Sequence, residues 1–302
     1  MDKEWEVTFS AWADGPGKTE QEKCERAERA VKNAIDNHRV LQALDLTVRA
    51  HGSYRVRTSI KQESDVDIYV QVNKSDFFPR YPEGKTKVDF GNVDGTFDYA
   101  AFKNEVGLAL RSYIGAATVT NGKNAFDVHE NTYRIDADVI AVLPCRWYTG
   151  RFNVDYSHHY YEGIAFRNAA GAVIKSFPED AYTSGAAKND ATFGRYKRVI
   201  RVIKNLRSYM EEKGVAEAKG IASFLIECLV WNVPDDMLGD DAYWQDVYRI
   251  LDFLRKGTAS WETCQKWKEV NEIRDLWDAK QLWTFAQANS FASAAWKFLE
   301  FN

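Results

Sequence analysis

The sequence predicts an α+β protein of two domains, in which a half of mixed strands and helices precedes a helical half. Its 302 residues exceed one typical domain, and 45% of them are apolar, which is enough for a sizeable core. Short apolar runs in the first half read as strands, whereas apolar residues beyond about residue 190 recur at helical spacing. We therefore expect two lobes around a cleft, with domains at 1–190 and 191–302 and a long helix near 195–210 that spans them.

Each element is predicted from its apolar period or from its composition. Apolar residues three and four apart indicate helices, alternation indicates strands, and Gly, Asp and Pro without a period indicate loops. In chain order we expect a helix over 19–44, a strand near 47–50, a strand around 65–70, a surface excursion over 73–98, a helix over 99–114, strands from about 117, a strand within 133–143, a weak strand over 162–177, a loop of small residues over 179–189 and a helix over 195–210.

The helix predicted over 195–210 has two distinct faces. Its apolar face predicts packing against a core. The opposite face is basic; such faces are usually solvated, but a triphosphate ligand is a competing explanation. The apolar residues are Val199, Val202, Ile203 and Leu206, and the basic ones are Lys197, Arg198, Arg201, Lys204 and Arg207.

Two acids between residues 51 and 70 carry the most specific chemistry in the chain. Asp65 and Asp67 stand two apart on a predicted strand, so their carboxylates project from one face while Val66 and Ile68 enter the core. Neighbouring like charges are tolerated when a divalent cation neutralises them, and hard oxygen ligands suit Mg²⁺ or Mn²⁺. The pair therefore indicates a metal site.

A Gly52-Ser53 pair precedes these acids by twelve residues. Glycine allows close approach of a ligand to the backbone, and N–H groups at the start of a following helix favour an anionic phosphate. By itself, Gly-Ser is usually only a turn and Asp-x-Asp a solvated strand end. Together they predict a grip on a metal-bound nucleoside triphosphate.

A third acid comes from residues 133–143, which read as another buried strand. Asp136 and Asp138 fall on the same face of that strand, and the apolar period does not choose between them. Three carboxylates on two neighbouring strands form the usual two-metal cage of phosphoryl transfer, with ions roughly 3.5 to 4 Å apart.

Composition excludes several other classes of protein. A net charge of −4 argues against a protein that binds nucleic acid stably through its backbone. The four cysteines lack metal-ligand spacing and are expected to be reduced, buried thiols. No signal-like start or long apolar run is present, so we expect a cytoplasmic protein that does not insert into membranes.

These motifs resemble those of the bacterial cGAS/DncV-like nucleotidyltransferases, specifically their clade E. The resemblance implies a polymerase-β-like nucleotidyltransferase core over 1–190 and a helical domain similar to that of oligoadenylate synthases over 191–302, with the active site in the cleft. It also implies a cyclic di- or trinucleotide product that alerts a downstream effector in antiphage (CBASS) signalling. It covers residues from about 20 to at least 235 and rests on Gly52-Ser53, Ser64–Asp67, Asp138, Gly185–Asn189, Tyr196–Leu206 and Ile221–Pro234.

Catalytic roles follow from this resemblance. Asp65 and Asp67 would hold two Mg²⁺ ions, which Mn²⁺ can replace. Asp138 would complete the cage and help to prepare the acceptor 3′-hydroxyl, because a run of small apolar residues follows it as in the family. Asp136 stays the alternative ligand.

Phosphate contacts are implied in the same way. Gly52 and Ser53 would cradle the triphosphate, with Lys197 and Ser223 closing on the phosphates. The plainer explanations are a solvated helix face for Lys197, with Lys204 as the alternative lysine, and a helix-start hydroxyl for Ser223.

Base choice has one visible determinant, Ser176. It lies where clade E members that take uridine carry an asparagine, whose amide can read a pyrimidine edge. The resemblance therefore implies ATP and GTP as substrates and cyclic di-AMP or a mixed AMP/GMP ring as product, unless Ser176 simply ends a strand before Pro178.

Two other functions fit parts of the pattern. A transferase that adds nucleotides to RNA or to a protein hydroxyl would use the same acids, although the net charge weakens the RNA version. A catalytically silent nucleotide-binding regulator would not need three neighbouring carboxylates, which carry an electrostatic cost.

Overall fold

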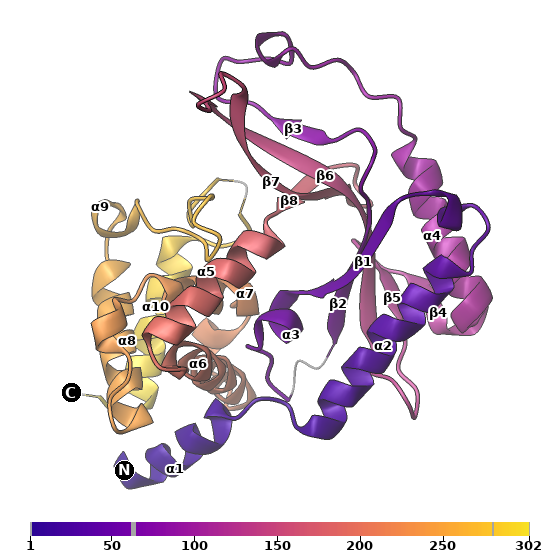
Figure 1. The fold of residues 1–302 in the computed structure, drawn as a ribbon. Helices are drawn as coiled ribbons and strands as arrows, with labels where there is room; N and C mark the ends of the chain where they lie inside the picture. Colours follow the sequence, from indigo (N-terminus) through magenta and orange to yellow (C-terminus); the bar gives the residue numbers. More distant parts are fainter. Residues whose placement is uncertain (1, 62–64, 280, 302) are drawn as a thin grey trace. The chain divides into compact units, whose positions relative to one another are not determined.

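The chain folds into two compact units, each built from separate stretches of sequence. The sheet unit comprises Gly17–Tyr54 and Ser64–Pro178, and the helical unit comprises Met1–Pro16, Arg55–Glu63 and Glu179–Asn302. The computed structural model describes residues 2–61, 65–279 and 281–301, whose course is drawn in Figure 1. This division differs from two continuous ranges meeting near residue 190, because the first helix and the segment 55–63 cluster with the helical unit.

The sheet unit alternates strands with a few helices. Short connections let successive strands pair, and longer helices supply an apolar face to cover the sheet. Its elements are α2 (Lys18–Asp36), η1 (Leu41–Ala43), β1 (Leu46–His51), β2 (Val66–Val72), β3 (Phe78–Arg80), η2 (Val88–Phe90), α4 (Tyr99–Ile114), η3 (Ala116–Thr118), β4 (Val119–Asn121), β5 (Phe126–Val128), β6 (Ala137–Phe152), β7 (His158–Arg167) and β8 (Val173–Ser176).

The strands form one mixed sheet around the long strand β6. Their order is β1-β2-β6-β5-β4 along its first half, and β2 runs parallel to β6 whereas β1, β5 and β4 pair antiparallel with their neighbours. The second half of β6 pairs with β3 and β7, and β7 pairs with β8. Strand β6 therefore links the two parts of the sheet.

One face of the sheet is covered by α2 and α4, which contact each other (Figure 1). Val31 of α2 and Leu110 of α4 are fully buried in one apolar cluster with Ile68 of β2 and Val139 of β6. Because strand side chains alternate between faces, the residues next to Ile68 and Val139 project to the other face. The core thus decides which side chains leave the sheet away from α2 and α4.

The sequence located most of these elements. The helix predicted over 99–114 is α4, and the strand expected near 47–50 is β1. The excursion over 73–98 contains a short strand, β3, and a 3₁₀ turn, η2.

The helical unit is assembled almost entirely from helices. The Glu6 carboxylate of α1 accepts the backbone N–H groups of Tyr243 (3.1 Å) and Trp244 (2.7 Å), which caps the start of α8. The short helix α3 (Gly52–Val56) carries the chain out of the sheet unit into this one. Its other elements are α1 (Asp2–Ala13), α5 (Pro178–Ala191), α6 (Arg195–Glu212), η4 (Ala216–Ala218), α7 (Ser223–Trp231), η5 (Asp235–Met237), α8 (Tyr243–Gly257), α9 (Trp261–Cys264) and α10 (Phe285–Phe298).

The loop predicted over 179–189 is wrong, because those residues lie inside helix α5. Pro178 occupies the first helical position, where its missing N–H costs nothing, and Glu179 and Asp180 fall in the first turn, where the helix dipole favours acids. The small residues that follow show no apolar period. For that reason a loop was predicted, although Pro178, Glu179 and Asp180 are typical of the start of a helix.

Helix α6 has the apolar face that was predicted, and Val199, Val202, Ile203 and Leu206 are all buried. Its basic side is not simply solvated. Lys204 is fully buried, and its ammonium donates to Glu227 Oε1 at 2.7 Å.

The Glu227 carboxylate joins three parts of the helical unit. The same Oε1 atom accepts the hydroxyl of Thr58 at 2.6 Å, so α7 is tied both to α6 and to the segment 55–63. A buried carboxylate and ammonium stabilise a fold only while each keeps its partner.

Replacement of Glu227 by leucine should lower the free energy of unfolding by about 3 to 5 kcal/mol, because it leaves the buried Lys204 charge unpaired. Urea unfolding measures this loss. The double variant K204M/E227L should recover most of it, and E211L, at an exposed position of the same unit, should stay within about 0.5 kcal/mol of the parent. An E227L loss no larger than that of E211L would contradict this account.

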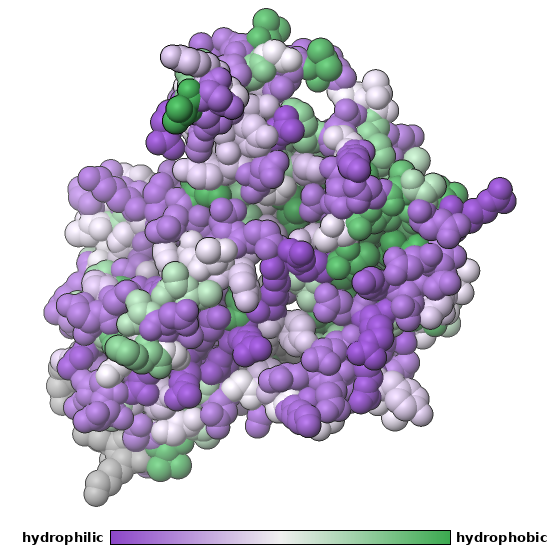
Figure 2. Space-filling model, viewed as in Figure 1, coloured by the Kyte–Doolittle hydropathy of each residue, from purple (hydrophilic) through white to green (hydrophobic). Residues whose placement is uncertain are grey.

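The cysteines are buried, as the composition predicts, and the face of the molecule that is drawn in Figure 2 is largely hydrophilic. All four cysteines are buried with free thiols, and burial raises the pKa of Cys24 to about 11. The face drawn in Figure 2 is largely hydrophilic, with small apolar areas. Within the ranges described, helices long and apolar enough to traverse a bilayer are absent.

Candidate active site

Three carboxylates lie side by side across strands β2, β6 and β5. Asp67 is paired with Asp138 in the parallel β2–β6 ladder, and Asp138 is paired with Asp127 in the antiparallel β5–β6 ladder. Directly paired residues of neighbouring strands project to the same face. Asp67, Asp138 and Asp127, which we call the acid row, therefore share the face turned away from α2 and α4.

Asp138 is the central member of this row and is half-buried. Its pKa is raised above the ordinary 3.8, first by burial and then by the negative charges of Asp127, Asp65 and Asp136. Each of these influences disfavours the ionised carboxylate. The site thus holds negative charge that an approaching cation would stabilise.

Asp65 and Asp136 flank the row from positions just outside the strands. Asp65 is exposed and precedes β2, and its charge reaches Asp138. Asp136 precedes β6, and its Oδ1 atom accepts the backbone N–H of Glu130 at 2.5 Å and lies 3.9 Å from His129 Nδ1. Asp136 is therefore engaged in its own loop, whereas Asp138 is the residue placed beside Asp67.

Gly52 is fixed by contact with the acid row. Its φ is +64°, and a Cβ atom added there would overlap the Asp67 carboxylate. Only glycine meets both demands without strain. Because Ser53 follows in α3 and His51 pairs with Asp67 across β1–β2, the Gly-Ser motif and the first acidic motif lie together.

Ser176 is the exposed last residue of β8 and is paired with Ile164 of β7. A Cβ atom at Gly163 would lie 2.5 Å from the Ser176 carbonyl oxygen, so the close approach of β7 fixes the backbone of Ser176. Ser176 therefore lies at the exposed end of a paired strand.

The other two predicted phosphate ligands belong to the helical unit. Lys197 of α6 is half-buried, and its pKa is lowered, first by burial and then by the Arg57 guanidinium. Ser223 begins α7, and its hydroxyl accepts a hydrogen bond from Arg207 Nη2 at 3.1 Å. The alternative lysine, Lys204, is buried against Glu227.

The donor atoms of the acid row fit a hard divalent cation such as Mg²⁺. Over the described stretches, no three His, Cys, Asp or Glu side chains converge as a ready-made metal site. Mg²⁺ at phosphoryl-transfer sites commonly takes one or two carboxylates and completes its shell with water and substrate phosphate oxygens. The row therefore suits a cation that arrives with a nucleotide better than a permanent protein cage.

Asp127 was missed in the sequence, although a signal was present. Phe126-Asp127-Val128 repeats the apolar-acid-apolar pattern of the strands that carry Asp67 and Asp138. Its strand has only three residues, so its period was too short to stand out. The carboxylate lies against Gly122, where a Cβ atom would overlap it.

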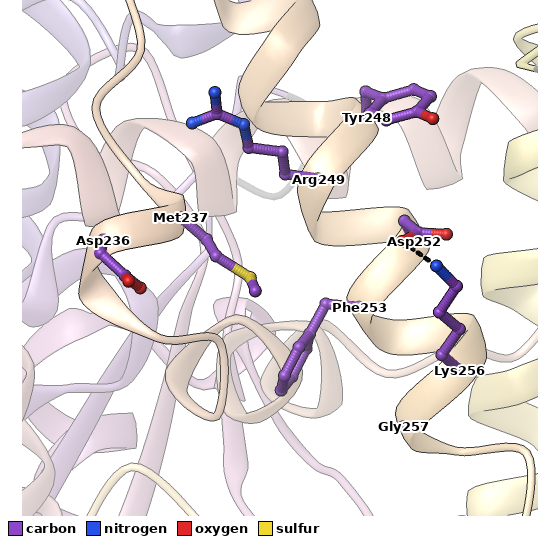
Figure 3. Close-up of a pocket in the computed structure, with 8 residues that line it drawn as sticks. All are labelled: Asp236, Met237, Tyr248, Arg249, Asp252, Phe253, Lys256 and Gly257. Carbon is purple, nitrogen blue, oxygen red and sulfur yellow. Dashed lines mark hydrogen bonds and ion pairs between the residues drawn. The ribbon is translucent and has the colours of Figure 1, made fainter.

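A surface pocket on the helical unit lies apart from the acid row in the chain. It has a volume of about 700 Å³ and lies between η5 and α8 (Figure 3). Its cations are neutralised locally, because Lys256 pairs with Asp252 at 2.6 Å and Arg249 with Asp240 at 2.7 Å. That balance does not suit a triphosphate, so we do not assign the reaction to this pocket.

Comparison with known proteins identifies close counterparts of the whole chain. A family model for the cGAS/DncV-like nucleotidyltransferase C-terminal helical domain matches residues 183–300. The cyclic dipyrimidine nucleotide synthase CdnE of Legionella pneumophila is 36% identical over the full length of both chains.

Two solved structures share the fold over nearly their whole length. The Rhodothermus marinus CdnE c-UMP-AMP synthase with Apcpp and Upnpp superposes with a TM-score of 0.82 at 28% identity, covering 98% of this chain and 97% of that one. The Elizabethkingia meningoseptica CdnE cyclic dinucleotide synthase with GTP and Apcpp gives 0.78 at 26%, covering 98% and 99%. The predicted α+β fold, with a polymerase-β-like core and a helical domain, is confirmed.

Replacement of Asp138 by asparagine should raise the melting temperature of the protein in EDTA at neutral pH. The folded pKa of Asp138 is raised, so its ionisation opposes folding once the pH exceeds its ordinary value, 3.8. The gain should shrink as the pH falls toward 3.8, the ordinary pKa, because the folded carboxyl is protonated first and the unfolded one follows only below that pH. Thermal unfolding from pH 4 to 8 measures it.

Replacement of Asp89 provides a control in which the change in stability has the opposite sign. The backbone N–H of Thr86, and then Lys85, lower the pKa of Asp89, so D89N should reduce stability at neutral pH and lose its effect in acid. Equal pH dependence of D138N and D89N would contradict the assigned electrostatics.

Proposed function

We propose a reaction for this chain, which belongs to the cGAS/DncV-like nucleotidyltransferase family and, within it, to the CdnE group of cyclic dinucleotide synthases. Two nucleoside triphosphates would be joined into a ring, with one pyrophosphate released for each bond formed. The observation that carries this proposal is the pairing of Asp67 with Asp138 on one face of the sheet, beside Gly52.

In the first step, the acceptor 3′-hydroxyl oxygen would bond to the α-phosphorus of the second nucleotide as the bond to pyrophosphate breaks. Asp65, Asp67 and Asp138 would hold two Mg²⁺ ions, which Mn²⁺ can replace. When bound, such cations neutralise charge on the phosphates and activate the attacking hydroxyl. Asp138, which lies beside Asp67 on the neighbouring strand, would also help to prepare the acceptor hydroxyl for attack.

Four residues would hold the phosphates. Gly52 allows the backbone to approach them, and Ser53 offers a hydroxyl and an N–H. Lys197 and Ser223 would bind the outer phosphates; the lowered pKa of Lys197 is consistent with a cation held among other cations until an anion binds.

A second round in the same site would close the ring after the linear intermediate turns over. We propose that the product acts in the cytoplasm as a second messenger, which alerts an effector of an antiphage (CBASS) system without a stable contact to this enzyme. This role rests on membership of the family.

For base choice we propose purine substrates, ATP and GTP. Ser176 supports this choice, because a hydroxyl lacks the paired donor and acceptor of an amide that reads a uracil edge. A pyrimidine-containing product is the rival, and it is favoured by the names of the Legionella and Rhodothermus relatives. Because it is exposed at the end of a paired strand, Ser176 is the position to test.

Asp67→Asn and Asp138→Asn should each lower the rate of nucleotide turnover by about 100-fold or more, because each removes charge stabilisation from the transition state. Asp136→Asn is the matched control: it lies two residues from Asp138, and its carboxylate is engaged by the Glu130 N–H. Release of pyrophosphate measures turnover. A large loss in D136N with activity kept in D138N would reverse the assignment.

Incubation of the protein with ATP, GTP, CTP and UTP and Mg²⁺ or Mn²⁺ should give a phosphatase-resistant purine ring by mass spectrometry. Ser176→Asn should increase uridine incorporation by about tenfold, because it restores a pyrimidine-reading amide. Ser176→Ala separates loss of the hydroxyl from gain of the amide. Uridine-rich product from the parent would overturn the purine proposal and leave the reaction class intact.

A further inference from the structure

Arg57 combines a strained backbone with an exposed cationic side chain. Its φ is +60°, in the left-handed region that favours glycine and that other residues adopt at a cost. It directly follows α3, whose first two residues are Gly52 and Ser53. The chain alone keeps Arg57 within about 14 Å of Ser53, since four extended residues span no more.

Hydrogen bonds on either side hold this strained conformation in place. Arg201 Nη1 of α6 donates to the Arg57 carbonyl at 2.6 Å, while its Nε donates to the Ala13 carbonyl at 2.6 Å. The next residue, Thr58, is buried, and its hydroxyl donates to Glu227 at 2.6 Å. Residues 58–60 are all buried, so the helical unit dictates the backbone on which the Arg57 side chain stands.

The same arrangement brings Arg57 next to Lys197. Lys197 and Arg201 are four apart on α6 and so lie one turn apart on one face. The carbonyl of Arg57 accepts a hydrogen bond from Arg201, and the charge of the Arg57 guanidinium, second to burial, lowers the pKa of Lys197, so the two cations lie near enough to repel each other.

Arg57 and Lys197 carry two positive charges that no described carboxylate neutralises in an ion pair. In the part of the chain that the structure describes, neither Arg57 nor Lys197 makes an ion pair. The charge of Asp190, and then that of Glu227, raise the pKa of Lys197, but burial and the Arg57 charge outweigh them. Adjacent like charges on a strained backbone cost free energy, which an anion bound between them would offset. Arginine suits this task because its planar fork can bind two phosphate oxygens.

We propose that Arg57 binds the triphosphate of the nucleotide substrate together with Lys197. This inference rests on the proposed function and adds a ligand that lies between the Gly52-Ser53 motif and the first acid in sequence. Binding of the triphosphate, a compact polyanion, explains why the strained position 57 carries a long cationic side chain rather than glycine. The base and ribose play no part in this contact.

Replacement of Arg57 by glycine tests the proposal, because glycine relieves the strain while it removes the charge. R57G should melt at the same temperature as the parent or higher. Its Kd for an ATP analogue with a non-cleavable α,β-methylene bridge should rise by about tenfold, as should its KM for ATP, which matches loss of one charge-assisted contact. The Kd for AMP, which lacks the outer phosphates, should not change.

Phe193→Gly is the matched control for strain. Phe193 is also an exposed residue of the helical unit with a left-handed φ, +50°, but it carries no charge. F193G should share the gain in melting temperature and leave the Kd for the ATP analogue unchanged. Arg57→Lys, which keeps the charge without the fork, should restore part of the lost affinity.

An R57G variant that binds the ATP analogue as tightly as the parent would overturn the proposal, and so would an equal loss in F193G. Loss of AMP binding in R57G would also overturn it, because that result indicates a distorted site. The binding measurements need no turnover. They are therefore independent of the turnover rates of D67N and D138N. If those two variants kept the parent's turnover rate, the proposed function would be refuted instead.

Discussion

The pairing of Asp67 with Asp138 across strands β2 and β6 is the constraint on which the rest of the site depends. Strand side chains alternate, so a slip of one residue would bury both carboxylates under α2 and α4. The complete burial of Ile68 and Val139 prevents that slip. The apolar core therefore places both carboxylates on one face. Burial, followed by the charges of Asp127, Asp65 and Asp136, raises the pKa of Asp138, so holding it ionised costs free energy. Binding of a cation with a polyphosphate would convert this cost into affinity.

The helical unit uses most of the cations on α6 for its own packing. Lys204 is buried against Glu227, Arg207 donates to the Ile221 carbonyl at 2.8 Å, and Arg201 braces the Arg57 carbonyl. Lys197 and Arg57 remain as cations whose partner is a ligand in our proposals. The segment 55–63 folds with the helical unit, although in sequence it joins the Gly52-Ser53 motif to Asp65. Substitutions in that segment thus act on both the fold and the site.

Sequence reasoning reached the parts of the site that depend on local periodicity. Alternation placed Asp67 on the face opposite the core, and the structure agrees. The apolar period left Asp136 and Asp138 open. The register with β2 and the hydrogen bond from Glu130, which distinguish their surroundings, are tertiary features that no local pattern contains. Helix α5 was missed because small residues give no apolar period. The strained backbone of Arg57 is a tertiary effect. The next residue, Thr58, is held by a hydrogen bond to Glu227, which lies 169 residues further along the chain.

The central claim is that Asp67 and Asp138 share a nucleotide-borne cation. Anomalous diffraction from crystals grown with Mn²⁺ and the α,β-methylene analogue of ATP tests it most directly, because manganese is located independently of the protein phases. The account predicts a manganese peak within coordination distance of carboxylate oxygens of both Asp67 and Asp138, with a phosphate oxygen on the same ion. Manganese bound at Asp136 without Asp138, or a nucleotide bound away from the acid row, would contradict it.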